Sequence, residues 1–206
     1  PECMTDELID TIASEDKICN YIDLPLQHAD GEILKKMNRR YTREEDFELY
    51  DKLKRELPGF AFTTDIIVGF PGEDEEAFED LATFVNEIEF DRLGCFEFSP
   101  QEGTPAFDME DDVEPDVKLR RGEIIMQDQL EIVTLKNQSR IGKTYRVVVE
   151  DYDSYTDSYS GRTYMDAPEI DGTISFTTNN NYEPGDFAEV IVIGVNDYDL
   201  IGKDVN

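Results

Sequence analysis

Residues 60–72 read FAFTTDIIVGFPG, and this stretch decides the fold class. Residues 60–68 become fully apolar towards their end, as expected for a strand that is buried on both faces of a parallel sheet. Two glycines and a proline in residues 69–72 then turn the chain sharply. The helix expected after the turn carries apolar residues at helical spacing that would cover one face of a sheet, namely Phe78, Leu81, Ala82, Val85 and Ile88.

Further strands and helices are predicted around this unit. Strands are expected at residues 19–26 and 93–98, and a short helix at residues 31–37. Thr42 and Glu45 form a capping box that opens another helix. Strands that alternate with helices are typical of a parallel α/β sheet, but three parallel strands cannot close a barrel. We therefore expect sequence before this chain to complete the sheet.

The second part of the chain has a different pattern. Pro115 opens a long predicted connector helix that extends to about residue 141. Short strands broken by Gly, Asn and Asp follow it, around a polar excursion at residues 151–160. Five such strands predict a small antiparallel β-barrel. The predicted domains are residues 1–140 and 141–206, and the predicted strands are 145–149, 161–165, 173–176, 187–193 and 199–201.

The charge of the chain limits the class of its partners. Lys and Arg number 19 against 49 Asp and Glu, a formal net charge of −30. Residues 141–206 alone hold four basic and thirteen acidic residues, a net charge of −9. Such a surface repels phosphate backbones and anionic membranes, which argues against nucleic acid and favours a basic protein partner. A generally acidic proteome in the source organism explains the charge equally well.

Cysteine content and hydropathy indicate the cellular compartment in which the protein is expected. Cys3, Cys19 and Cys95 are odd in number and far apart, which suits reduced thiols better than a disulfide framework. No apolar run approaches the roughly 20 residues of a membrane-spanning helix, and no signal peptide is recognisable. We therefore expect a cytoplasmic protein. Because the first residue is Pro1 rather than Met, we also expect a fragment or a processed chain.

Polar side chains and turn residues follow each of the three predicted parallel strands. The strand ends carry Gln27 with His28, the glycine turn at residues 69–73, and Ser99 with Pro100. In (β/α) barrels the chemistry lies at this end of the strands. Turns after such strands also need Gly and Pro for purely structural reasons, so composition leaves both interpretations open.

Five strings of sequence resemble the radical S-adenosylmethionine methylthiotransferase family, in order and nearly end to end. They are YIDLPLQHA (21–29), MNRRYTREE (37–45), TTDIIVGFPGE (63–73), FDRLGCFEFSPQEGTPA (90–106) and GRTYMDAPEIDG (161–172). The resemblance implies an α/β fold: the C-terminal half of a TIM-type (β/α) barrel, followed by an OB-like TRAM β-barrel that recognises the substrate.

The last of these strings separates two branches of the family. Residues 166–172, DAPEIDG, resemble the branch that adds a methylthio group to the β-carbon of an aspartate in the small-subunit ribosomal protein S-twelve. The other branch comprises the tRNA 2-methylthioadenosine synthases. The resemblance thus implies a basic ribosomal protein as partner, and a tRNA enzyme or a non-catalytic acidic binding module remains the alternative.

The resemblance also implies cofactors. Family members use S-adenosylmethionine and two 4Fe-4S clusters, one of them bound through a C-x3-C-x2-C motif. Neither cluster motif occurs among the three cysteines of this chain. The family likeness therefore implies that the cluster ligands lie in a missing N-terminal half of the same protein, that no metal ligand lies here, and that the fragment is inactive alone.

Candidate site residues follow from the same likeness. Those aligned with cofactor contacts share positions at the strand tips: Gln27, His28, Arg39, Arg40, Thr64, Asp65, Ile67, Gly69, Gly72 and Ser99. For the TRAM domain, Asp166, Glu169 and Asp171 are the candidates that would meet basic side chains of the substrate. Turn geometry, a structural histidine, surface ion pairs and solvated carboxylates are the structural alternatives. No catalytic residue is predicted.

Overall fold

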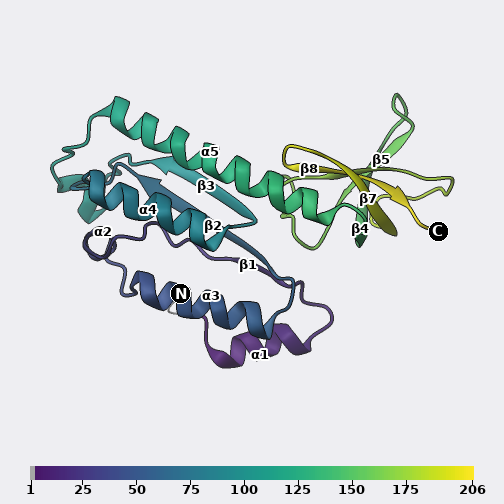
Figure 1. Ribbon diagram of the computed structural model, residues 1–206, viewed down its shortest axis with the longest axis horizontal. Helices are drawn as coiled ribbons and strands as arrows, with labels where there is room; N and C mark the ends of the chain where they lie inside the picture. Colours follow the sequence, from purple (N-terminus) through teal and green to yellow (C-terminus); the bar gives the residue numbers. More distant parts are fainter. Residues whose placement is uncertain (1–2) are drawn as a thin grey trace. The chain divides into compact units, whose positions relative to one another are not determined.

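A computed structural model describes residues 3–206, which form two compact units (Figure 1). The first unit extends to Gln129 and the second begins at Leu130. Among residues 3–206, no helix is both long enough and apolar enough to cross a bilayer.

The first unit is built on a three-stranded parallel sheet. Its strands are β1 (Tyr21–Asp23), β2 (Ala61–Val68) and β3 (Arg92–Glu97), in the spatial order β1-β2-β3. The helices are α1 (Asp6–Ser14), α2 (Gly31–Lys36), α3 (Arg43–Glu56) and α4 (Glu75–Ile88). The predicted half of an α/β barrel is thereby confirmed, although β1 is shorter than the strand expected at residues 19–26. Pro25, which has no N–H group to donate, follows closely after β1.

Aromatic side chains hold the helices against one face of the sheet. Phe62 of β2 lies 5.2 Å from Phe90 between ring centroids, and Phe90 lies 6.0 Å from Phe84 of α4. Phe47 of α3 meets Phe84 edge-on at 5.3 Å. All three of Phe62, Phe84 and Phe90 are buried, so this face carries the core of the unit.

The opposite face of the sheet is less covered. Strand alternation places Asp65 and Ile67 of β2 on this face, where they pair with Gly94 and Phe96 of β3. Phe96 of the edge strand β3 is 57% exposed, whereas parallel α/β sheets usually have both faces covered. An exposed inner face is the consequence expected of three strands from a barrel that they cannot close.

Helix α5 (Pro115–Arg140) confirms the long helix predicted from Pro115 onward. Before it, the chain passes through a single 3₁₀ turn, η1 (Pro105–Asp108). In the first unit, the side chain of Gln129 donates to the carbonyl oxygen of Phe90 at 3.0 Å. In the second unit, the side-chain amide of Asn137 donates to the carbonyl oxygens of Asp197 and Tyr198. Both side chains are buried, so hydrogen bonds fix the helix within each unit.

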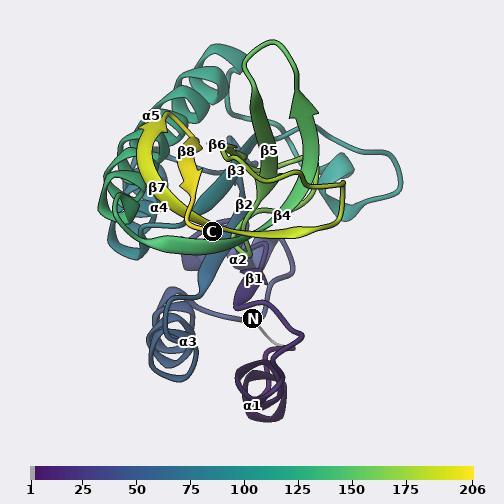
Figure 2. The same ribbon diagram turned by 90° about the vertical axis from the view of Figure 1, so that its right-hand side faces the viewer.

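The second unit is a closed five-stranded barrel in the order β4-β5-β6-β8-β7 (Figure 2). The strands are β4 (Thr144–Asp153), β5 (Ser158–Arg162), β6 (Ile174–Thr177), β7 (Phe187–Asn196) and β8 (Asp199–Asp204). Alternate residues of these strands fill the interior: Val147, Val149, Ile174, Phe176, Ala188, Val190, Val192 and Leu200. The predicted small five-stranded barrel is confirmed.

The barrel differs from the prediction in strand direction and in one loop. β6 pairs with β8 in parallel, so the expectation of a purely antiparallel barrel is wrong. Five strands cannot alternate in direction all the way round a closed barrel, and at least one neighbouring pair must therefore run parallel. The polar excursion expected at residues 151–160 instead extends the β4–β5 hairpin, where Tyr152 pairs with Tyr159.

Candidate functional site

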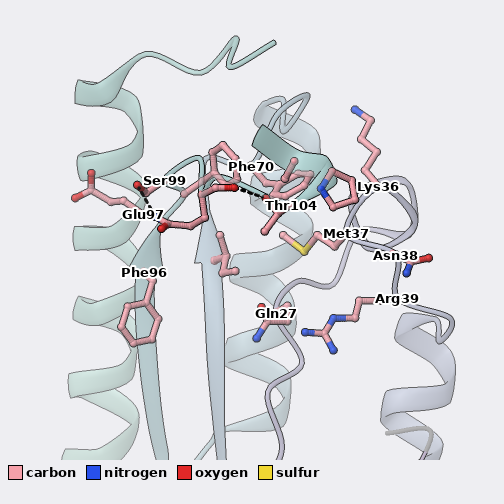
Figure 3. Close-up of a pocket in the computed structure, with 15 residues that line it drawn as sticks. Gln27, Lys36, Met37, Asn38, Arg39, Phe70, Phe96, Glu97, Ser99 and Thr104 are labelled. Carbon is pink, nitrogen blue, oxygen red and sulfur yellow. Dashed lines mark hydrogen bonds between the residues drawn. The ribbon is translucent and has the colours of Figure 1, made fainter. Parts of the chain in front are cut away.

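A cavity of about 490 Å³ lies at the strand tips of the first unit (Figure 3). Its volume lies within the range of small-molecule sites. Four of the predicted cofactor residues line it, namely Gln27, Arg39, Ile67 and Ser99. The structure thus brings together residues that are 72 positions apart in the sequence.

Strand and turn residues build the walls of this cavity. Ile67 and Phe96 are register partners on β2 and β3. The rings of Phe70 and Phe98 meet edge-on with their centroids 5.0 Å apart. Aromatic and aliphatic side chains in this arrangement provide a surface against which a flat heterocycle packs.

Gln27 marks the end of the chain segment that follows β1. Its backbone has the left-handed φ of 67°, which is uncommon outside glycine. The N–H of Gln27 donates to the carbonyl of Asp65 at 2.9 Å, and its own carbonyl accepts from the N–H of Ile67 at 2.8 Å. These two bonds fix the Gln27 backbone beside β2 at the edge of the cavity.

Two cations lie on the side of the cavity formed by α2 and the turn after it. The Nζ of Lys36 donates to the carbonyl of Pro71 at 3.3 Å, and Arg39 is exposed on the cavity lining. A guanidinium group at such a position can bind a carboxylate through two parallel hydrogen bonds. Arg40 is exposed as well but is not part of the lining.

Thr64 and Asp65 lie on opposite faces of β2, and neither belongs to the cavity lining. The buried Thr64 hydroxyl donates to the carbonyl of Leu24 at 3.0 Å and accepts from the N–H of Leu26 at 3.1 Å. Asp65 occupies the space left by Gly94, since a Cβ at Gly94 would lie 2.7 Å from its Oδ1. Burial raises the pKa of Asp65, and the nearby charge of Asp23 adds to the effect.

The glycines of the turn after β2 are required by backbone geometry. Gly69 and Gly72 have φ of +70° and +82°. A Cβ on Gly69 would overlap the side chain of Lys118, and one on Gly72 would overlap the ammonium of Lys36. Both glycines lie outside the cavity lining. Their geometry is therefore explained by the turn itself.

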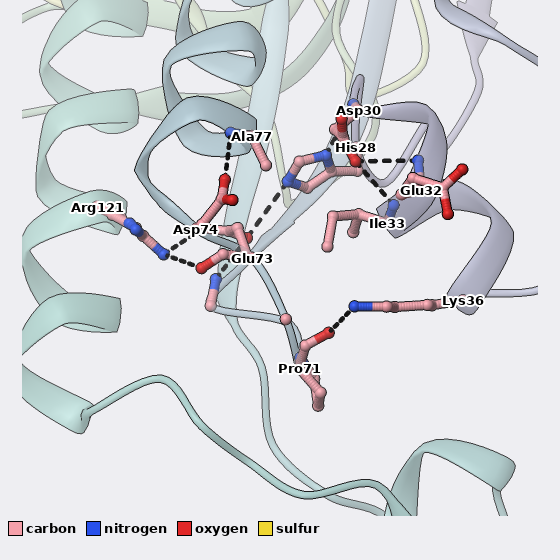
Figure 4. A network of polar contacts seen from close by, with 12 residues as sticks. His28, Asp30, Glu32, Ile33, Lys36, Pro71, Glu73, Asp74, Ala77 and Arg121 are labelled. Atoms are coloured by element: carbon pink, nitrogen blue, oxygen red, sulfur yellow. Dashed lines mark hydrogen bonds and ion pairs between the residues drawn. The ribbon is translucent and has the colours of Figure 1, made fainter.

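His28 lies in a buried polar network rather than on the cavity lining (Figure 4). Its Nε2 is 3.3 Å from Oε2 of Glu73, and Oε1 of Glu73 accepts from Nη1 of Arg121 at 2.9 Å. Neither Glu73 nor Arg121 was predicted from the sequence as a partner of His28. The position of Glu73 directly after the glycine turn could have indicated a role at the strand tips. Arg121 lies 48 residues further along the chain, on a helix, and nothing in the sequence links it to Glu73.

The three predicted substrate residues of the barrel differ in exposure. Asp166 is 6% exposed, and its carboxylate accepts from the Thr163 hydroxyl at 2.7 Å. Asp171 accepts from the N–H of Ala167 at 2.7 Å and stabilises the loop. Glu169 is exposed, with a left-handed φ of 64°. Of the three, Glu169 thus presents the most accessible carboxylate.

Comparison with known proteins places both units. Residues 1–85 match the model of the radical SAM superfamily, and residues 141–205 match that of the TRAM domain. Over all 206 residues, the chain is 46% identical to the ribosomal protein uS12 methylthiotransferase RimO of Acetivibrio thermocellus. The chain is similar in sequence to RimO methylthiotransferases. The RimO of Caldanaerobacter subterraneus is 44% identical over 98% of the chain.

The chain spans about 46% of the length of both RimO relatives. A solved structure, coproporphyrinogen III oxidase of Escherichia coli, superimposes with a TM-score of 0.49 at 24% identity. That superposition covers 64% of this chain and 30% of the other. The relationship to RimO rests on sequence alone.

The cysteines do not form a metal centre within residues 3–206. No group of three or more His, Cys, Asp or Glu side chains in this part of the chain is arranged to hold a metal ion. Cys3 and Cys19 are exposed, and Cys95 is half-buried on β3. Burial raises the pKa of the Cys95 thiol to about 12, and the charges of Glu73 and Glu97 add to this effect.

Proposed function

We propose that this chain is part of a RimO-type radical SAM methylthiotransferase, which adds a methylthio group to the β-carbon of an aspartate in ribosomal protein uS12. The identity of 46% to a RimO protein over all 206 residues carries this proposal. Because the chain spans less than half of that relative, the complete reaction would require the rest of the protein.

The cavity at the strand tips fits S-adenosylmethionine in its chemistry. Ile67 and Phe96 offer an apolar surface for the adenine ring, and Arg39 offers a cation for the carboxylate. Gln27 and Ser99 add neutral polar groups at the same edge. When bound, the cofactor would supply radical chemistry that abstracts hydrogen from an unactivated carbon.

Other predicted cofactor residues would act from behind the cavity. Thr64 binds the chain segment after β1 to β2, and Asp65 shares the inner face of the sheet with Ile67. Gly69 and Gly72 shape the turn that carries Phe70 to the cavity. These residues would orient the cavity walls. In this proposal Arg40 serves as a second cation near the cavity, and His28 acts through the buried network described below.

The iron–sulfur clusters do not fit the residues of this chain. Within residues 3–206, no three or more His, Cys, Asp or Glu side chains are grouped so that they could hold a metal ion. We therefore assign the ligands of two 4Fe-4S clusters to the remainder of the protein. The chain by itself should bind S-adenosylmethionine without cleaving it.

The barrel would recognise the ribosomal protein. Residues 141–205 match the TRAM domain, and we set the domain boundary between residues 140 and 141. With a net charge of −9 over residues 141–206, this domain would attract a basic polypeptide. Glu169 would make direct contact, whereas Asp166 and Asp171 would hold the loop that presents it.

Mass spectrometry tests the proposed function most directly. Ribosomal protein uS12 and tRNA would be digested from cells with and without the gene that encodes this chain. A methylthio group on an aspartate of uS12 that disappears with the gene is the expected result. A modified tRNA adenosine that depends on the gene, with uS12 unchanged, would contradict the proposal and establish the tRNA enzyme instead.

A further inference from the structure

Glu73 is a buried carboxylate on which three separate chain segments converge (Figure 4). Its side chain has no exposed surface. Oε2 accepts from the N–H of Gly69 at 2.8 Å and lies 3.3 Å from Nε2 of His28, while Oε1 accepts from Arg121 at 2.9 Å. The carboxylate of Glu73 therefore contacts three segments: the tip after β1, the turn after β2 and helix α5.

The hydrogen bonds of His28 define which ring nitrogen carries the proton. Its Nδ1 accepts from the N–H of Asp30 at 3.0 Å, so this nitrogen holds no proton. The proton accordingly lies on Nε2 and is donated to Glu73. Because His28 has no exposed surface, water cannot replace either contact. The ring thus joins the beginning of α2, which Asp30 caps, to the turn after β2.

Both segments held by Glu73 continue directly into the wall of the cavity. Gln27 precedes His28 in sequence, and Phe70 follows Gly69; both line the cavity. The left-handed backbone of Gln27 is a conformation that persists only where its surroundings impose it. The contact of His28 with Glu73 provides such a constraint one residue away.

We propose that Glu73 and His28 are positioning residues for S-adenosylmethionine, because together they set the spacing between the Gln27 wall and the Phe70 wall of the cavity. This inference rests on the proposed function. Arg121, whose side chain is 4% exposed, balances the buried charge of Glu73. Sites that bind through several weak contacts lose affinity when their walls are displaced by even a fraction of an ångström.

A purely stabilising role explains this network less well. Buried ion pairs are often replaced by apolar residues at no cost to stability, since desolvation of the charges offsets their attraction. The network also includes an unfavourable feature, because Nε of Arg121 is buried without a hydrogen-bond partner, which lowers the stability of the fold. The hydrogen bonds of the network are directional, and each donor that reaches Glu73 fixes the position of one chain segment adjacent to the cavity.

Matched variants separate positioning from stability. His28→Leu removes both hydrogen bonds of the ring, whereas His28→Gln retains one acceptor and one donor. Glu73→Gln removes the shared anion, and Glu75→Gln is its control, because Glu75 also contacts Arg121, at 3.2 Å, but with an exposed side chain. We expect S-adenosylmethionine affinity, measured by calorimetry, to fall at least tenfold in His28→Leu and Glu73→Gln. It should change less than threefold in His28→Gln and Glu75→Gln.

Amide hydrogen exchange without ligand provides a second readout. Faster exchange at Gln27 and Ile67 in His28→Leu, restored in His28→Gln, is the expected pattern. Equal affinity and equal exchange in the two His28 variants would overturn the inference, even if Glu73→Gln proved too unstable to measure. If the unmodified chain failed to bind S-adenosylmethionine, the proposed function would be at fault, and the exchange data would still decide whether His28 positions the wall.

Discussion

The substitution Asp46→Asn should stabilise the first unit, and increasingly so as the pH rises. Asp46 lies in the first turn of α3, is 2% exposed, and neither carboxylate oxygen has a hydrogen-bond partner. Burial, with a smaller contribution from the charge of Glu45, raises its pKa from 3.8 to about 7. A buried anion without a partner is costly, and the amide of asparagine removes the charge while keeping the shape.

The magnitude follows from the two pKa values. Moving the pKa of Asp46 from 3.8 to about 7 corresponds to about 4 kcal/mol between its two protonation states. The partial positive charge of the helix N-terminus favours the carboxylate by up to about 1 kcal/mol. We therefore expect Asp46→Asn to raise the free energy of unfolding by about 3 kcal/mol at pH 8.5.

The sign of the pH dependence is fixed by linkage. Because the folded-state pKa of Asp46 is raised, the folded protein holds this proton more tightly than the unfolded chain does. The stability that the proton confers is complete below about pH 4, decreases as the pH rises towards 7, and is lost above it. At pH 4 the variant and the unmodified protein should therefore unfold at nearly the same urea concentration.

Urea unfolding followed by helical circular dichroism, at pH 4, 5.5, 7 and 8.5, measures this difference. Asp51→Asn is the matched control, since Asp51 is exposed on the same helix. It should leave the pH dependence unchanged. If Asp46→Asn were destabilising at pH 8.5, or if its effect were independent of pH, then Asp46 would be an ionised and stabilised carboxylate, and the reasoning from burial would be refuted.

Three further outcomes are expected. Arg39→Ala should weaken S-adenosylmethionine binding about tenfold by calorimetry, the scale of one charge-assisted contact, and Arg40→Ala should weaken it by a smaller factor, because Arg40 lies outside the cavity lining. Thr42→Ala should lower the free energy of unfolding by about 1 kcal/mol in urea, because it removes the reciprocal cap of α3. Burial alone would raise the pKa of Asp204, but hydrogen bonds from Thr178, Tyr182 and other groups outweigh it and lower the pKa to about 2. Acid should therefore destabilise the barrel as the pH falls from about 4 to 2. In Asp204→Asn that loss should be absent from thermal unfolding curves.

Local features of the fold could be predicted from sequence because few residues determine them. The capping box of Thr42 and Glu45 forms as expected, with both reciprocal hydrogen bonds present. Positive φ at Gly69 and Gly72 follows from their place in a sharp turn. In these cases the physical cause lies within a few positions of the residue itself, so a single sequence contains the necessary information.

Contacts between segments that are distant in the sequence could not be predicted in this way. Nothing in the spacing of the residues indicates that Arg121 reaches Glu73, or that Gly94 leaves room for Asp65. The parallel pairing of β6 with β8 likewise depends on how the barrel closes rather than on any strand's own sequence. Asp166 was predicted as a surface carboxylate, but its hydrogen bond to Thr163 depends on a turn that composition does not reveal.

The cations of the barrel argue further against a tRNA substrate. Residues 141–206 contain Lys143, Arg146, Arg162 and Lys203 as their basic residues. Arg162 is paired with Glu150 at 2.8 Å, and the guanidinium of Arg146 lies over the ring of Phe187 at 4.1 Å. Phosphate binding needs several unengaged cations on one surface, since each neutralised phosphate contributes to affinity through counterion release. With half of its basic side chains already engaged and thirteen acidic residues around them, the barrel is better suited to binding a cationic polypeptide than an RNA backbone.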